Sequence, residues 1–166
     1  MATIVVGLDG SRGSDAALRW ALAEARLRGS DVRAVHVYQP PPLIPADTAV
    51  GIGGVAYSAP FSSEEIERLR SAAEREAQAV IEGALGRIGL DAFAGIEVRQ
   101  ETLEGPTAQT LIEAGRGAEL LVLGSRGRGG FLGLLLGSVS QQCAQHPPCP
   151  VVILPPPEEV ESGSGR

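Results

Sequence analysis

One segment of the sequence has a glycine spacing suited to binding a phosphate. Gly124 is followed three positions later by Gly127, and nine further residues separate Gly127 from the pair Gly137-Ser138. A short apolar run, ELLVL, precedes the segment, and a stretch with helical character follows it. Glycines expose backbone N–H groups, and the first N–H groups of a helix have no partner within the helix. The segment therefore predicts an anion site, with a purely structural turn as the alternative.

Two well-known phosphate-binding loops do not fit this segment. A P-loop requires the pattern G-x-x-x-x-G-K-[ST], and the sequence contains no lysine. A dinucleotide-binding G-x-G-x-x-G follows the first strand of its domain, whereas this segment follows the fourth predicted strand. The predicted anion site is therefore of another kind.

Three charged residues could complete such a site. Asp9 ends the first predicted strand, where a carboxylate can accept a hydrogen bond from a ribose hydroxyl or help to hold a metal ion. The alternative for Asp9 is an Asx-turn or a helix cap, because Asp-Gly-Ser is ordinary turn chemistry. Arg126 and Arg128 could pair with phosphate oxygens. The alternative for both arginines is a solvated charge on a loop, and the sequence leaves these alternatives open.

The sequence has no recognisable catalytic or zinc-binding pattern. His36 lies between two valines of a predicted strand, which favours a buried, hydrogen-bonded histidine over a catalytic one. His146 stands at a predicted helix end, and with Cys143 and Cys149 it does not make a zinc pattern. No Ser-His-Asp order or pair of carboxylates suggests nucleophilic or acid–base catalysis.

Composition restricts the class of protein. A chain of 166 residues with 43% hydrophobic and 20% charged residues is typical of one globular domain. The net charge of −6 argues against a nucleic-acid partner. We expect no membrane span, because the sequence has no apolar run of about eighteen residues. The start of the chain does not resemble a signal peptide, and the cytoplasm is the expected location.

Alternating strand and helix patterns position the candidate residues. Apolar and β-branched runs predict strands at residues 3–8, 32–38, 95–103, 119–123 and 150–154. Helical spacing and capping residues predict helices from Ser14 or Asp15 to Gly29, from 64 to 87 after Ser62 or Ser63, from Pro106 to about Arg116, and from the glycine segment to about Gln145. Residues 39–63 are rich in Pro and Gly, so we expect no regular structure there but a lid or a flexible loop. The acidic tail, residues 156–166, is expected to be mobile.

This order of elements predicts a single α/β domain over residues 1–155. Continuous apolar strands alternating with helices indicate a parallel sheet with helices on both faces. Ligands of such sheets bind at the carboxyl ends of the strands. Asp9 and the glycine segment are therefore expected to form one site where the first and fourth strands end.

The chain resembles the universal stress protein family over about residues 2–155. The glycine segment matches the pattern G-x-x-G-x9-G-[ST] of its nucleotide-binding branch, and VVGLDGS, VHV, Gly105-Pro106 and GSVSQQCAQHPPCPVVIL also match. The resemblance implies an open five-stranded parallel sheet in the order 3-2-1-4-5, a Rossmann-like adenine-nucleotide fold. Residues 39–63 and the acidic tail depart from the family pattern.

The resemblance also implies where ATP, with or without Mg²⁺, would bind. Asp9 would take the ribose, or a magnesium ion bound with the nucleotide, and the Val37 backbone would meet the adenine edge. Gly7, Gly105 and Leu123 would line the same pocket. The phosphates would be held by Gly124, Ser125, Arg126, Gly127, Arg128, Gly129, Gly130, Gly137, Ser138 and Val139.

The resulting hypothesis is an ATP-binding stress-response protein whose nucleotide acts as a regulatory ligand. The resemblance implies a homodimer paired through the last strand, Pro150–Leu154, with a client that the sequence does not identify. One alternative is an enzyme with slow ATP hydrolysis. Another is a protein-interaction module without nucleotide binding, and a cyclic nucleotide is an alternative ligand.

Overall fold

The computed structural model describes residues 2–39, 50–52, 55–57, 62–89, 94–127 and 135–156. Several predictions concern residues outside these ranges. Arg128, Gly129 and Gly130, most of the 39–63 segment and nearly all of the acidic tail belong to this group.

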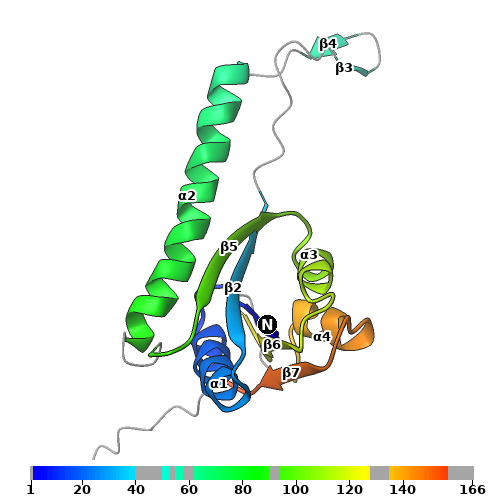
Figure 1. Ribbon diagram of the computed structural model, residues 1–166. Coiled ribbons are helices and arrows are strands. Elements are labelled where there is room, and N and C mark those ends of the chain that lie inside the picture. The colour runs from blue at the N-terminus through cyan, green and yellow to red at the C-terminus, as the bar shows by residue number, and fades with distance from the viewer. Residues whose placement is uncertain are drawn as a thin grey trace, which may run out of the picture.

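Five parallel strands form the central sheet (Figure 1), in the order β5-β2-β1-β6-β7. The order 3-2-1-4-5 is thereby confirmed, since these are the third, second, first, fourth and fifth strands of the sheet along the chain. Their bounds are Thr3–Gly7 (β1), Asp31–Tyr38 (β2), Val98–Glu104 (β5), Leu120–Gly124 (β6) and Val151–Leu154 (β7). The central strand β1 is covered on both faces, and Ile4, Val5 and Val6 are fully buried. This burial explains its continuous apolar sequence.

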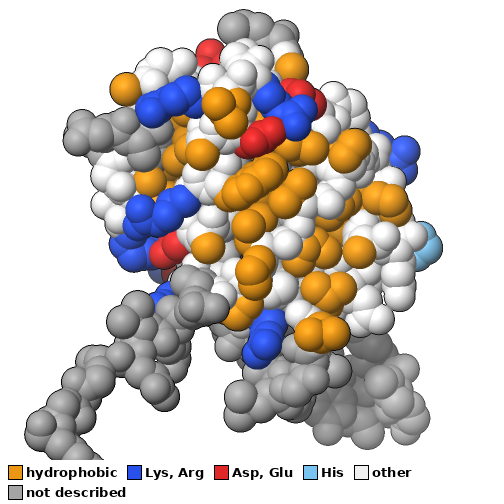
Figure 2. All heavy atoms as spheres, turned by 90° about the horizontal axis from the view of Figure 1, so that it is seen from below, with side chains coloured by type: hydrophobic (Ala, Val, Ile, Leu, Met, Phe, Trp, Pro, Cys, Tyr) orange, Lys and Arg blue, Asp and Glu red, His pale blue; other side chains and the backbone are white. Residues whose placement is uncertain are grey.

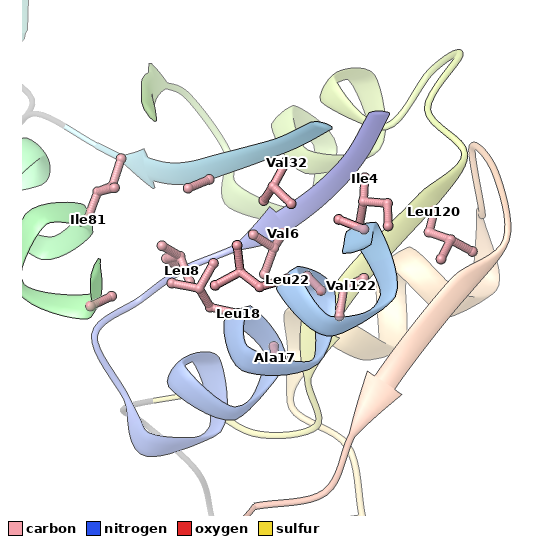
Figure 3. Close-up of a cluster of buried hydrophobic side chains, with 14 residues drawn as sticks. Ile4, Val6, Leu8, Ala17, Leu18, Leu22, Val32, Ile81, Leu120 and Val122 are labelled. Carbon is pink, nitrogen blue, oxygen red and sulfur yellow. The ribbon is translucent and has the colours of Figure 1, made fainter. Parts of the chain in front are cut away.

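Helices cover both faces of the sheet (Figure 1), as predicted. Helices α1, Arg12–Arg28, and α2, Ser63–Ile88, lie on one side, and α3, Thr107–Ala114, and α4, Ser138–Gln145, lie on the other. Each side has its own hydrophobic core. Figure 3 shows the first core, where Leu18 and Leu22 of α1 pack beside Val6 of β1.

The start of α1 differs from the prediction. The N-cap is Ser11, and not Ser14 or Asp15, because the Ser11 side chain accepts the backbone N–H of Ser14 at 3.1 Å. Sequence spacing alone placed the helix too late, since Ser11, Ser14 and Asp15 are all good capping residues. At the start of α2 the N-cap is Ser62, which forms a capping box with Glu65.

The 39–63 segment also differs from the prediction of no regular structure. It contains an antiparallel hairpin formed by β3, Val50–Ile52, and β4, Val55–Tyr57. In the sequence, two glycines separate these β-branched and aromatic residues, and this pattern favours a two-residue hairpin connection. The remaining helices and strands begin and end within a few residues of the predicted positions, as is usual for element ends.

Candidate functional site

A cavity of about 580 Å³ lies at the carboxyl ends of β1, β2 and β6, next to the N-terminus of α4. This volume is in the usual range for small-molecule sites. Its position agrees with the rule that parallel sheets bind ligands where the strands end. The residues that line it come from segments more than 100 positions apart in the sequence, with Gly7 at one extreme and Gln141 at the other.

The N-terminus of α4 presents backbone N–H groups to the cavity. Its N-cap is Gly137, which has no side chain to accept a hydrogen bond from the first turn. Helices α1 and α2 are each capped by a serine side chain, whereas α3, which follows Pro106, and α4 have no side-chain cap. Gly137, Ser138 and Val139 all line the cavity. The first N–H groups of α4 and the positive end of its dipole therefore favour an anion there.

Nothing in the described surroundings of position 137 requires a glycine there. The backbone of Gly137 has φ −75° and ψ 165°, which any residue can adopt. A Cβ placed on Gly137 would meet its nearest neighbour, the Ser125 carbonyl oxygen, at 3.5 Å, an ordinary van der Waals distance. A glycine that the surrounding protein does not demand, at an uncapped helix start facing a cavity, leaves room for a ligand to approach the backbone.

Ser125 holds together the two ends of the glycine segment. Its carbonyl oxygen accepts hydrogen bonds from the Gly137 N–H at 2.7 Å and from Ser140 Oγ at 3.0 Å. Its own N–H donates to the carbonyl oxygen of Leu154 in β7 at 2.7 Å. These contacts place the start of the segment beside the start of α4.

Two buried polar atoms next to this junction have no hydrogen-bond partner among the described residues. They are Ser125 Oγ and Arg126 Nε. Arg126 lines the cavity, so its guanidinium brings positive charge to the same region as the N-terminus of α4. An unpaired buried polar group is costly unless a further group satisfies it. A bound anion or water would reduce this cost for Arg126.

Asp9 lies against the glycine segment. Its Oδ1 accepts hydrogen bonds from the backbone N–H of Ser11 at 3.0 Å and from Ser11 Oγ at 2.5 Å. A Cβ placed on Gly127 would overlap Asp9 Oδ2, so Gly127 allows the carboxylate and the segment to touch. The turn predicted as an alternative for Asp9 is present, and Asp9 also lines the cavity.

A second glycine contact joins the same two segments. A Cβ on Gly124 would lie 2.8 Å from the backbone carbon of Gly13, and a Cβ on Gly13 would lie 2.9 Å from the carbonyl oxygen of Arg126. The turn after β1 and the turn after β6 therefore pack backbone against backbone, as close approach between glycines permits. This packing brings the two turns together beside the cavity, which Gly124 lines.

The other end of the cavity is apolar. Val37, Leu111 and Leu123 line it and are at least nine-tenths buried. Gly7 lies between two of them, since a Cβ at this position would lie 2.6 Å from Leu123 Cδ2 and 3.3 Å from Leu111 Cδ1. Such a surface suits a flat, largely apolar group, while the α4 end suits a charged one.

Residues 1–155 match the universal stress protein family. A universal stress protein of Mycolicibacterium smegmatis is 34% identical over 151 residues, covering 91% of this chain and 47% of that protein. The chain belongs to the universal stress protein family. A universal stress protein of Mycobacterium tuberculosis is 33% identical over 155 residues, covering 92% of this chain and 47% of that protein. The chain thus spans about half the length of these curated relatives.

Solved structures of universal stress proteins share the fold. UspA of Lactobacillus plantarum has a TM-score of 0.69 at 19% identity, covering 92% of this chain and 97% of that one. A universal stress protein in complex with cAMP has a TM-score of 0.55 at 23% identity, with coverage of 93% and 97%. The protein from Archaeoglobus fulgidus in complex with dAMP has a TM-score of 0.50 at 22% identity, with coverage of 92% and 97%. At these identities the likeness establishes the fold.

The structure brings most of the predicted site residues of this universal stress protein to the cavity. Those that line it are Gly7, Asp9, Val37, Leu123, Gly124, Arg126, Gly127, Gly137, Ser138 and Val139. Ser125 lies behind the cavity, at the junction already described. Gly105 does not line it either, and its N–H donates to the carbonyl oxygen of Tyr38 at 3.0 Å. Gly105 has φ +148° and a Cβ there would overlap Thr110 Oγ1, so its glycine is explained by local packing.

Other lining residues were missed by the sequence analysis. They are Leu8, Ser14, Val35, His36, Thr107, Leu111, Leu136, Ser140 and Gln141. For most of them the available signal was a position within two or three residues of a predicted residue, on the same strand end or first helical turn. Ser14 and Leu111 had no such signal, since they lie five and six residues after Asp9 and Gly105. The prediction of a hydrogen-bonded His36 is confirmed, since its Nδ1 donates to the Leu8 carbonyl oxygen at 2.6 Å. His36 is only half-buried, however.

Within the described ranges, no helix is both long and apolar enough to cross a membrane. The same ranges hold no group of three or more His, Cys, Asp or Glu side chains arranged to bind a metal ion.

Proposed function

We propose that this universal stress protein binds an adenine nucleotide, ATP with or without Mg²⁺, in the cavity beside α4. The observation that carries the proposal is the uncapped N-terminus of α4, with a glycine at position 137 that its described surroundings do not require. In a capped helix the first N–H groups are already satisfied, whereas here they point to a cavity. A phosphate is the ligand group that best matches them.

The two ends of the cavity suit the two ends of a nucleotide. The adenine would lie at the apolar end against Val37, and the ribose would lie by Asp9. The phosphates would lie between Gly127 and the first turn of α4, near Arg126. Structural neighbours in complex with cAMP and dAMP support a ligand that contains adenine and at least one phosphate.

We assign the nucleotide a regulatory role, as a ligand and not as a substrate. Among the described residues that line the cavity, the titratable side chains are Asp9, His36 and Arg126. Asp9 Oδ1 is occupied by Ser11, and His36 Nδ1 donates to a carbonyl oxygen. A general base aligned with an attacking water is not evident in this set.

The proposal is tested by calorimetric titration of the protein with ATP in the presence and absence of Mg²⁺. The informative variant is Gly137→Ser, because a serine hydroxyl at an N-cap accepts the N–H groups that would bind phosphate. We expect this variant to gain a few tenths of a kcal/mol in free energy of unfolding without ligand. We expect its ATP affinity to fall at least about tenfold, because the new cap competes with the ligand.

The matched control is Gly86→Ser on the exposed face of α2, where a Cβ meets nothing within 4 Å. This variant should bind ATP like the unmodified protein. Absence of ATP binding by the unmodified protein would contradict the proposed function. Equal ATP affinity for Gly137→Ser and the unmodified protein would show that α4 does not hold the phosphates.

We also propose that the protein forms a homodimer through the open edge of β7. Within the described strands, β7 pairs only with β6, and an unpaired strand edge favours pairing with another chain. Its four residues are half-buried. In Figure 1, α1 and β7 lie at the bottom of the molecule. Figure 2 shows the molecule from below, and hydrophobic side chains gather on that face.

A further inference from the structure

Ser11 has two roles in the turn after β1. Its Oγ accepts the backbone N–H of Ser14 at 3.1 Å, which caps α1. The same Oγ lies 2.5 Å from Asp9 Oδ1, and the Ser11 N–H donates to this oxygen at 3.0 Å. Ser14 Oγ in turn donates to the carbonyl oxygen of Ser11 at 2.9 Å. The turn is therefore held by a connected set of hydrogen bonds.

The chemistry of the partners sets the direction of these bonds. A backbone N–H can only donate, so Ser11 Oγ accepts from Ser14, and its own proton is available to Asp9. An ionised carboxylate can only accept, so the Ser11 hydroxyl donates to Asp9 Oδ1. Bonds of this kind, from a hydroxyl to a carboxylate, are short and strong. The positive end of the α1 dipole lies behind this bond and favours the negative charge of Asp9.

The position of Asp9 is fixed from two sides. Ser11 holds Oδ1, and the Cα of Gly127 lies against Oδ2 so closely that a Cβ would overlap it. A carboxylate held in this way has a defined orientation at the cavity wall. Asp9 lines the cavity next to Gly127. In the proposed binding mode this is where the sugar of a nucleotide would lie.

We propose that Ser11 is a positioning residue, which orients the Asp9 carboxylate so that the site selects nucleotides by their sugar hydroxyls. This inference rests on the proposed function, and it adds the source of ribose selectivity. Ser11 does not line the cavity, so it acts through Asp9. Loss of the Ser11 hydroxyl would remove one of the two bonds from residue 11 to Oδ1 and keep the backbone N–H bond, so the carboxylate would be held less firmly and could rotate away from the sugar hydroxyls.

The experiment compares the affinities of the full chain for ATP, 2′-deoxy-ATP and 3′-deoxy-ATP by calorimetry. We expect the unmodified protein to bind ATP about tenfold or more tightly than at least one deoxy analogue, as expected for a hydrogen bond to a charged group. For Ser11→Ala the ratio should fall to within about threefold of unity, mainly through weaker ATP binding. Ser11→Thr retains the hydroxyl and should restore most of the selectivity.

A matched control separates positioning from helix capping. Ser62 is the N-cap of α2, and its side chain accepts the Glu65 N–H at 3.3 Å, far from the cavity residues. Ser62→Ala should lower the urea midpoint by an amount similar to Ser11→Ala, because both lose an N-cap side chain. It should leave the ratio of ATP to deoxy-ATP affinity unchanged.

The outcomes distinguish this inference from the proposed function. Absence of ATP binding by the unmodified protein would overturn both. ATP binding without any preference over either deoxy analogue would leave the nucleotide site intact and overturn the inference. A preference that persists in Ser11→Ala would assign the selectivity to Asp9 without help from Ser11, and would also overturn it.

Discussion

The three glycines of the G-x-x-G-x9-G pattern serve different physical purposes. Gly124 lets the β6 turn pack on the backbone of Gly13, and Gly127 lets the segment touch the Asp9 carboxylate. Gly137 has ordinary backbone angles and room for a Cβ. The first two glycines bring the two turns together beside the cavity, and the third leaves the N-terminus of α4 open. Substitutions at these positions should therefore have different consequences.

Alanine at Gly124 should destabilise the fold, while alanine at Gly137 should not. At Gly124 the new Cβ would lie 2.8 Å and 3.0 Å from the backbone carbon and oxygen of Gly13, and a backbone cannot move aside as a side chain can. We expect Gly124→Ala to lower the free energy of unfolding by about 1–3 kcal/mol. Gly137→Ala should lower it by less than about 1 kcal/mol, the cost of a poorer N-cap.

Urea denaturation without nucleotide measures both effects. The two variants can be compared directly because Gly124 and Gly137 line the same cavity. A loss of stability for Gly137→Ala as large as that for Gly124→Ala would show that position 137 is constrained by the protein and not by a ligand.

An ion pair joins the edge strand β5 to β2. Arg33 of β2 donates to both carboxylate oxygens of Glu101 in β5, at 2.9 Å and 2.7 Å, and also to the Ala114 carbonyl oxygen at the end of α3 at 2.9 Å. The hydrogen bonds from Arg33 hold the pKa of Glu101 below its ordinary value. The pair thus connects two strands and a helix at the partly buried edge of the sheet.

This pair should make stability depend on pH. Because the pKa of Glu101 is lowered in the folded state, the pair contributes fully above the unfolded pKa of about 4.3. Its contribution is lost as the pH falls through the lower, folded-state pKa. We expect Glu101→Gln to lower the free energy of unfolding by about 1 kcal/mol or less at pH 7, after allowance for solvent screening. The difference from the unmodified protein should shrink below about pH 4.

The control is Glu97→Gln, whose partner Arg99 lies at 2.8 Å with both side chains more than half exposed. Exposed pairs contribute little, so this variant should follow the unmodified protein across the pH range. Urea midpoints measured from pH 3 to pH 7 provide the comparison. A constant difference for Glu101→Gln at all pH values would be inconsistent with a charge effect.

Helices and strands were largely predictable because their signals are local. Apolar runs and three- and four-residue spacings located the five strands of the sheet and the four helices. The errors occurred where several nearby residues could play one role. Ser11, Ser14 and Asp15 can all cap a helix, and only the hydrogen bond to the Ser14 N–H identifies Ser11. The β3–β4 hairpin was missed because the prolines and glycines of residues 39–63 outweighed the short β-branched runs of the two strands.

At the scale of the whole molecule, β7 offers an edge for a second chain. The carbonyl oxygens of Pro150 and Leu154 accept hydrogen bonds from the Leu121 and Ser125 N–H groups on the β6 side. Since backbone groups alternate in direction along a strand, the N–H groups of Val151 and Ile153 point to the open edge. A dimer paired through this edge would use these two N–H groups in hydrogen bonds to the second chain.

Ile153→Pro should therefore yield a folded monomer. Proline removes an N–H that faces the open edge and leaves the hydrogen bonds to β6 in place. Sedimentation velocity over a range of concentrations should show a dimer for the unmodified protein and a monomer for this variant, with unchanged far-ultraviolet circular dichroism. Val152→Pro is the contrasting variant, because it removes an N–H that points to β6 and should unfold or weaken the sheet. A monomeric unmodified protein would contradict the proposed interface.

Local patterns in the sequence were sufficient to predict the α/β class, the succession of strands and helices, and the position of the polar segments at strand ends. These features depend on neighbouring residues, whose spacing and propensities are visible without coordinates. The resemblance to universal stress proteins added the strand order and a list of candidate residues, most of which line the cavity.

The contacts among those residues could not be predicted and are known from the three-dimensional fold. The contact of Asp9 with Gly127 and that of Gly13 with Gly124 join segments more than 100 residues apart. The order of residues cannot show such contacts, because they depend on how two turns meet after the whole sheet has formed. For the same reason only the structure separates Gly124, which meets the Gly13 backbone, and Gly127, which meets the Asp9 side chain, from Gly137, where a Cβ meets its described neighbours at ordinary distances.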